Sequence, residues 1–162
     1  MSADEARGRR RLASVSIDDG SIDRGSPDQE HERAIAIYDL VEENSFAVPD
    51  RDDGPYDLRI GLQDARLAFD IRTQAGDSVL AFGLSLTPLR SILKDYFLVC
   101  ENYYAAIRTA SAAQIEAIDR SRGALHDEAA ELVAQRLADK VDVDAATARR
   151  LFTLICALHW KA

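Results

Sequence analysis

The sequence predicts an α+β protein in which an antiparallel sheet of three to four strands is packed on one face by a long central helix and several further helices. Apolar and polar residues alternate over residues 56–86, which is typical of strands. Residues 87–158 instead repeat their apolar positions with the period of a helix. The two linking segments inside the alternating region, 63–65 and 74–77, are short enough for hairpins.

The first strand and the first long helix are marked by local signals. Residues 13–17 alternate between apolar and polar side chains, which predicts a short strand that ends at the Asp-Asp-Gly of 18–20. Ser26–Gln29 (SPDQ) then offers a serine N-cap, a proline for the first helical position and a glutamine for a capping box. We expect this helix to run to about Glu43, followed by a turn-rich loop over residues 49–55.

Three strands should then form an antiparallel meander with one apolar face. They cover residues 56–63, 66–72 and 80–86. The opposite face of the sheet is mixed and contains the small residues Gly61, Ala81 and Gly83.

A long helix should follow, capped by Thr87 and reaching about Arg108. Its apolar stripe is wide, so we expect this helix to lie centrally, between the sheet and the later helices. Tyr96, Tyr103 and Tyr104 belong to this stripe, where they are either core residues with hydroxyls at the rim or the lining of a binding groove.

Two more helices complete the expected architecture. Ser111 and Gln114 form a second capping-box pattern for a helix that extends to about Lys140. Residues 121–123 (Ser-Arg-Gly) leave open whether that helix is continuous. Asp144 should cap the last helix, which runs to about residue 158.

Length and charge limit the domain organisation and the partners. A chain of 162 residues fits one domain, so we expect a single α+β domain over residues 12–162 and a disordered, arginine-rich arm over residues 1–11. The net charge is −8, and because four arginines and two acids give the arm +2, the remainder carries −10. An acidic body repels phosphate backbones, which argues against nucleic-acid binding.

The sequence shows no membrane span and no secretory signal, and this pattern predicts a soluble cytoplasmic protein. Cys100 and Cys156 are far apart and form no metal-ligand spacing, so we expect two reduced, buried thiols. No phosphate-binding glycine loop, nucleophile elbow or HExxH pattern is present, and we predict neither a cofactor nor a metal.

Six ionisable residues are predicted to turn toward the protein interior and form a candidate polar cluster. On the first long helix, Ala34, Ile37, Tyr38 and Val41 indicate the apolar face, and Glu30 lies in line with them one turn earlier. The cluster consists of Glu30, His31, Arg33, Asp119, Arg122 and His126. In one interpretation these residues form salt bridges that fix helix packing. In the other they line a cleft where a carboxylate and a histidine act as acid and base beside an anion-binding arginine.

The chain contains the segments EHERA (30–34), DLVEENSF (39–46), LSLTP (84–88), LKDYF (93–97), CENYYAAIR (100–108), IEAID (115–119), VDVD (141–144) and TARRLFTLIC (147–156). In combination these segments resemble a small alphaproteobacterial family, uncharacterised protein family 0262. The resemblance covers roughly residues 14–161. It implies a compact cytoplasmic bacterial protein without an assigned activity, cofactor or partner, so no catalytic residue is transferred from it.

Two main functional hypotheses follow. The first is a binding or regulatory protein-interaction module, which includes a homodimer, with a structural polar cluster between helices. The alternative is a small-molecule binder or enzyme that uses acid–base residues in an interhelical cleft. A third hypothesis, contact with nucleic acid through the arginine arm, has only the charge of residues 1–11 in its favour. The sequence does not decide whether the protein is an enzyme, and it gives no substrate, ligand, oligomeric state or pathway.

Overall fold

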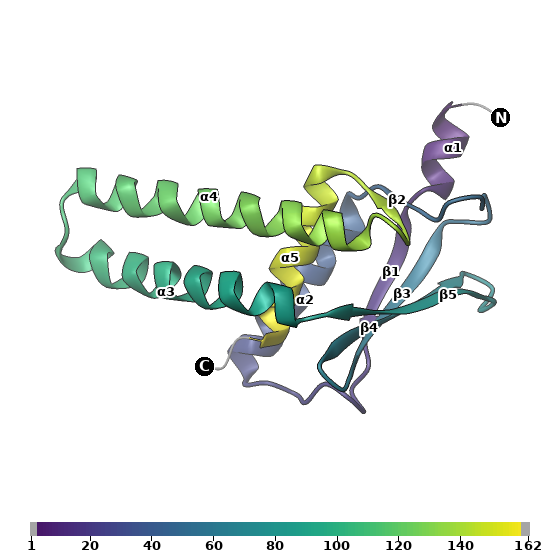
Figure 1. The fold of residues 1–162 in the computed structure, drawn as a ribbon, viewed down its shortest axis with the longest axis horizontal. Coiled ribbons are helices and arrows are strands. Elements are labelled where there is room, and N and C mark those ends of the chain that lie inside the picture. The colour runs from purple at the N-terminus through teal and green to yellow at the C-terminus, as the bar shows by residue number, and fades with distance from the viewer. Residues whose placement is uncertain (1–2, 160–162) are drawn as a thin grey trace.

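The structure, a computed structural model, describes residues 3–159 and confirms the α+β class (Figure 1). The described helices are α1 (Ala3–Arg9), α2 (Pro27–Glu42), α3 (Thr87–Thr109), α4 (Ala112–Leu137) and α5 (Ala145–His159). The described strands are β1 (Leu12–Ile17), β2 (Phe46–Ala47), β3 (Tyr56–Gln63), β4 (Arg66–Thr73), β5 (Ser78–Ser85) and β6 (Asp142–Val143).

The main sheet has the strand order β1-β3-β4-β5. Strands β3, β4 and β5 form the predicted antiparallel meander, but β1 pairs in parallel with β3, so the sheet is mixed. A parallel pair needs a crossover connection, and α2 lies in the chain segment that makes it. The edge of β1 is covered at its first residue, because the side chain of Asn44 accepts a hydrogen bond from Leu12 N (2.7 Å) and donates one to Leu12 O (3.1 Å).

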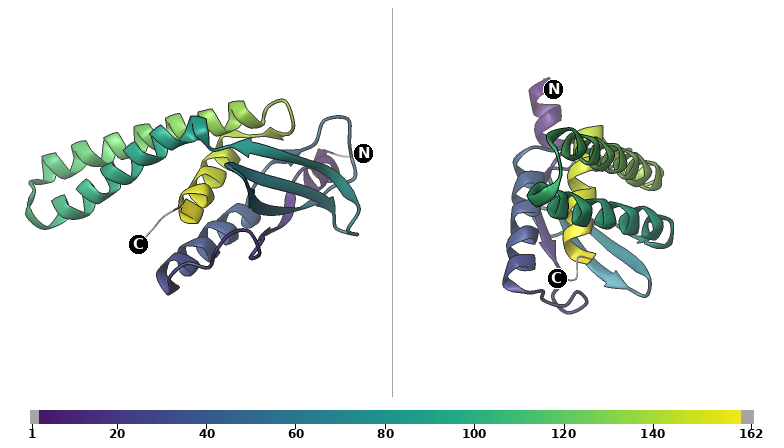
Figure 2. Two further views of the ribbon diagram at one scale, coloured as in Figure 1. Left: turned by 60° about the horizontal axis from the view of Figure 1, so that its bottom comes forward. Right: turned by 90° about the vertical axis from the view of Figure 1, so that its left-hand side faces the viewer.

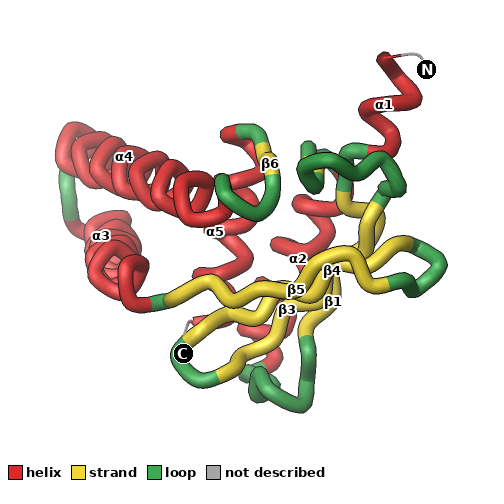
Figure 3. The backbone as a smooth tube through the Cα atoms, turned by 45° about the vertical axis from the view of Figure 1, so that its right-hand side comes forward, coloured by secondary structure: helices red, strands yellow, loops and turns green. Residues whose placement is uncertain are grey.

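Helix α5 is a central helix of the fold. It packs against both α2 and α4, and its residues Leu151, Phe152 and Leu154 are completely buried. Helices α2 and α5 lie together on one side of the sheet (Figure 3). The helix expected to lie between the sheet and the later helices, α3, is buried at its base, and its main contacts are with α4.

Helices α3 and α4 form an antiparallel hairpin that projects from the body (Figure 2). From here on, 'the arm' means this hairpin and not residues 1–11. The base of the arm is buried at Leu89, Ile92 and Leu93. Towards the tip, Leu98, Tyr104 and Ile107 are 55%, 64% and 50% exposed. The distal half of the arm is thus supported mainly by the contact between its own two helices.

The local helix signals are mostly confirmed. Both capping boxes form, with the backbone N–H groups of Gln29 and Gln114 each donating to the preceding serine hydroxyl across 3.2 Å. Asp144 accepts a hydrogen bond from the backbone N–H of Thr147 (2.8 Å), as a cap should.

One local expectation differs from the structure, and one question left open by the sequence is answered. Thr87 is the first residue of α3 and not its cap. Helix α4 continues without a break through residues 121–123, because one glycine costs a helix only about 1 kcal/mol. Residues 3–9 form helix α1, and Arg9 pairs with Asp52 at 3.2 Å. The disordered, arginine-rich segment over residues 1–11 and the single domain over residues 12–162 stay predictions.

Candidate functional site

The side chain of Arg33 on α2 forms hydrogen bonds with the C-terminal end of α5. Its side chain is 7% exposed, and Nε donates to the carbonyl oxygen of Ala157 (3.1 Å) while Nη2 donates to that of Leu158 (3.3 Å). Nη1 donates to Asp23 O (3.0 Å) and to Glu30 Oε1 (3.1 Å). The last carbonyls of a helix lack partners within the helix, and a cation there also complements the helix dipole. Arg33 and Glu30 therefore serve helix packing.

The buried face of α2 is rotated from the expected one. The buried residues are Arg33, Ala36 and Leu40, whereas Tyr38, which we placed on the apolar face, is 66% exposed. Ala34 is also exposed. The apolar residues of α2 are spread around the helix, so their pattern alone does not fix which side is buried.

The second half of the predicted cluster lies on the arm and at its junction with α5. Asp119 Oδ1 accepts a hydrogen bond from Arg122 (2.6 Å), and the Arg122 guanidinium stacks 4.1 Å from the centre of the Tyr103 ring. His126 lies nearer the body, where its Nε2 is 3.0 Å from the Thr153 hydroxyl. The histidine ring also meets the rings of Tyr96 and Phe152 edge-on.

The structure therefore brings together Glu30 with Arg33, and Asp119 with Arg122, as two separate i,i+3 pairs. No polar contact described for residues 3–159 joins one pair to the other, and His31 is exposed. A shared functional role for the six residues stays a prediction.

Burial favours the neutral forms of His126, Cys100 and Cys156, which lie between α3, α4 and α5. Burial lowers the pKa of His126, and the positive charges of Arg149 and Arg122 lower it further, against a smaller opposing effect of Asp127. Burial also raises the pKa of the Cys100 and Cys156 thiols. Neutral thiols are poor nucleophiles, so this junction lacks an activated cysteine.

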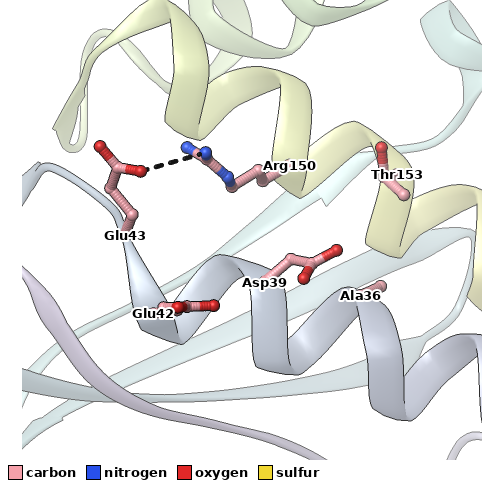
Figure 4. A pocket seen from close by; sticks show the side chains of 6 residues that line it. All are labelled: Ala36, Asp39, Glu42, Glu43, Arg150 and Thr153. Carbon is pink, nitrogen blue, oxygen red and sulfur yellow. Dashed lines mark ion pairs between the residues drawn. The ribbon is translucent and has the colours of Figure 1, made fainter.

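An interhelical groove runs between α2 and α5 and continues under the arm. We define it as two adjoining hollows that share Thr153. The first has a volume of about 490 Å³ and is lined by Ala36, Asp39, Glu42, Glu43, Arg150 and Thr153 (Figure 4). The second has a volume of about 360 Å³ and is lined by Asp28, Gln29, Glu32, Tyr96, Phe97, Cys100, Tyr104, Thr153, Cys156 and Ala157. Both are open hollows at the surface, in which a ligand would remain partly exposed.

One wall of the groove is apolar and comes from α3. Phe97, Cys100 and Tyr104 share one side of α3, and Cys156 and Ala157 of α5 extend the apolar surface below them. Tyr104 is the most exposed of these residues. An aromatic residue left open beside a hollow is typical of a protein-binding surface.

The opposite wall is acidic and comes from α2. Asp28, Glu32, Asp39 and Glu42 lie within an arc of about 80° on this helix. Glu43 pairs with Arg150 at 3.6 Å, but no ion pair to the other four carboxylates occurs within residues 3–159. In the sequence, the spacing of Asp28, Glu32 and Asp39 indicates one side of a helix, but the groove beside them depends on the tertiary structure.

Within the described part of the chain, no three His, Cys, Asp or Glu side chains are grouped so that they could hold a metal ion. Nor does any helix in that part have the length and apolar character needed to cross a membrane.

The fold and the groove define an α+β protein with a projecting helical hairpin and an open, two-sided surface groove. By sequence, the chain belongs to the Uncharacterised protein family (UPF0262), whose model matches residues 9–161. This confirms the resemblance noted above.

Close relatives are similar along almost the whole chain. A UPF0262 protein of Methylobacterium radiotolerans is 58% identical over 159 residues, which are 98% of this chain and 99% of the relative. One of Azorhizobium caulinodans is 62% identical over 153 residues, 93% of this chain and 94% of the relative. No solved structure matches the chain.

Proposed function

We propose that this protein is a cytoplasmic protein-interaction module and that a partner protein binds in the interhelical groove. The observation that carries this proposal is the exposed apolar wall of α3. Tyr104 is 64% exposed although it lies on the same side of α3 as the half-buried Phe97 and Cys100. Solvent exposure of a contiguous apolar surface is costly in a free monomer, and a bound protein would remove that surface from water.

The arm gives a physical reason for a binding role. The main contacts of α3 are with α4, and Ile107 extends the exposed apolar side towards the tip. A helix held on one side only leaves a second side free for a partner, as in grooves that bind amphipathic helices. The Glu30–Arg33 pair fits the structural role of the polar cluster in this hypothesis, because Arg33 is buried, whereas the Asp119 side chain of the Asp119–Arg122 pair is 56% exposed.

The alternative, a small-molecule binder or enzyme, has weaker support. Acid–base chemistry needs a carboxylate or histidine within hydrogen-bond reach of its proton partner and with a suitable pKa. His126 contacts Thr153 rather than a carboxylate, and its pKa is lowered by burial. The high pKa of the two thiols likewise argues against nucleophilic catalysis.

Site-specific photo-crosslinking in the native host tests the proposal. A benzophenone amino acid replaces Tyr104 in the groove, and the control places it at Leu98, which is similarly exposed on the same helix but does not line the groove. We expect a discrete protein adduct from position 104 that is absent from position 98. Equal adducts from both positions, or none from position 104, would contradict a groove-bound partner.

A further inference from the structure

Resting on the proposed function, we propose that the groove recognises a basic amphipathic helix of another protein. The groove has two chemically different sides: the apolar surface of Phe97, Cys100 and Tyr104, and the carboxylates of Asp28 and Glu32. A helix with an apolar stripe and a flanking row of lysine or arginine matches both sides at once.

The walls explain why the ligand should be a helix and not a strand. All three elements around the second hollow are helices, whose interior backbone groups are already hydrogen-bonded. A strand laid in this groove would therefore leave its own N–H and C=O groups without protein partners, whereas a helix satisfies them internally. The exposed side of α3 from Phe97 to Ile107 spans about 15 Å, so roughly three helical turns would cover it.

Charge explains why the ligand should be basic. The carboxylates of Asp28 and Glu32 are one turn apart on α2, and like charges at this spacing destabilise a helix. The next carboxylates along the same side, Asp39 and Glu42, extend the negative potential into the first hollow. A cationic side chain placed opposite these groups would relieve the repulsion and speed association.

A second copy of this chain is a poor occupant by the same criteria. The chain carries a net charge of −8, so two copies repel each other. Helix α5 has the highest net charge of the described helices, with Arg149 and Arg150 and no acid, but it already packs against α2 and α4. Its apolar side is therefore not available to fill the groove of a second copy.

Three labelled synthetic peptides test the inference on the full-length protein by fluorescence anisotropy. The first is a helix of about 14 residues with a leucine stripe flanked by lysines, the second replaces every lysine by glutamate, and the third scrambles the first so that its apolar stripe is lost. We expect the basic amphipathic peptide to bind at least about tenfold more tightly than either control, and its affinity to fall with added salt.

Matched variants locate the binding. The double variant Asp28→Asn/Glu32→Gln should bind the basic peptide about fivefold or more weakly, because it neutralises only the acidic wall. Tyr104→Ser should weaken it about as much, whereas Leu98→Ser, on the same helix but outside the groove, should leave it unchanged. All four substitutions are at partly or largely exposed positions, so circular dichroism can verify that each variant is folded.

Equal binding of the acidic peptide, no effect of the Asp28/Glu32 variant, or an equal effect of Leu98→Ser would each overturn the inference. The inference would also fail if the crosslinker at position 104 joined two copies of this chain and light scattering showed a dimer. If position 104 instead captures another protein through a segment that is not a basic helix, the proposed function stands and this inference fails.

Discussion

The Nε2 atom of His126 lies 3.0 Å from the hydroxyl oxygen of Thr153, a contact that joins the middle of α4 to α5. The Nδ1 atom of the same ring is buried and has no hydrogen-bond partner among the described residues. The neutral ring can occupy this place at moderate cost, but the protonated ring would bury a charge near Arg149 and Arg122.

This geometry predicts a pH-dependent stability. The pKa of His126 in the folded protein lies below the value of 6.5 for a free side chain, so the unfolded chain takes up the proton first as the pH falls. The contribution of the neutral ring to the free energy of unfolding is complete above about pH 6.5 and is lost as the pH falls towards the pKa of the folded state. Urea unfolding at several pH values measures this loss.

The control for this prediction separates His126 from other titrating groups. His126→Gln should flatten the pH dependence between about pH 7 and pH 5, because it removes the titrating ring but keeps a polar side chain at this position. An unchanged slope in His126→Gln would show that the ring does not contribute to the pH dependence.

Arg33 should be among the most sensitive polar positions of the chain. Arg33→Ala removes the donors to Ala157 O and Leu158 O, and we expect it to lower the free energy of unfolding by about 2–3 kcal/mol. Arg59, paired with Asp18 at 3.0 Å but 60% exposed, provides the comparison, since Arg59→Ala should cost less than about 1 kcal/mol. Chemical denaturation measures both, and equal losses would contradict a special role for the buried arginine.

Two glycines should respond oppositely to alanine. Gly123 lies inside α4 with nothing within 4 Å of an added Cβ, so Gly123→Ala should stabilise the protein by about 0.5–1 kcal/mol. At Gly61 a Cβ would come 2.9 Å from Ser21 Oγ, which accepts a hydrogen bond from Leu62 N. Gly61→Ala should therefore lower the melting temperature, and thermal unfolding of the two variants side by side tests the contrast.

The thiols of Cys100 and Cys156 should react slowly with iodoacetamide at neutral pH. Burial raises the pKa of both groups, so little thiolate is present. Mass spectrometry should show labelling at least about tenfold slower in the native protein than in urea. Rapid native labelling of either cysteine would mean that the junction of α3 and α5 opens readily.

The parts of the fold that depend on neighbouring residues could be predicted from the sequence. The meander β3–β4–β5 and the caps at Ser26, Ser111 and Asp144 all follow from patterns a few residues long. The position of α3 could not be predicted in this way. Its wide apolar stripe does require two contact surfaces, but only α4 supplies an extensive one within the described chain.

The candidate site was harder to predict, because it too depends on contacts between residues that are far apart in the sequence. The partners of Arg33 lie 124 and 125 residues further along the chain, so its burial has no local signature. The spacing of the acids of α2 places them on one side of the helix, but their relation to Tyr104 depends on the tertiary arrangement of α2, α3 and α5.

The distance in sequence between Arg33 and Ala157 also has a consequence during translation. Helix α2 leaves the ribosome well before the carbonyl groups that receive its guanidinium, which lie 124 and 125 residues further along the chain. Until then the arginine must stay hydrated, because burial of an unpaired cation is too costly. The nascent chain therefore cannot complete its tertiary fold until α5 has emerged. Until then it should remain accessible to proteases and chaperones.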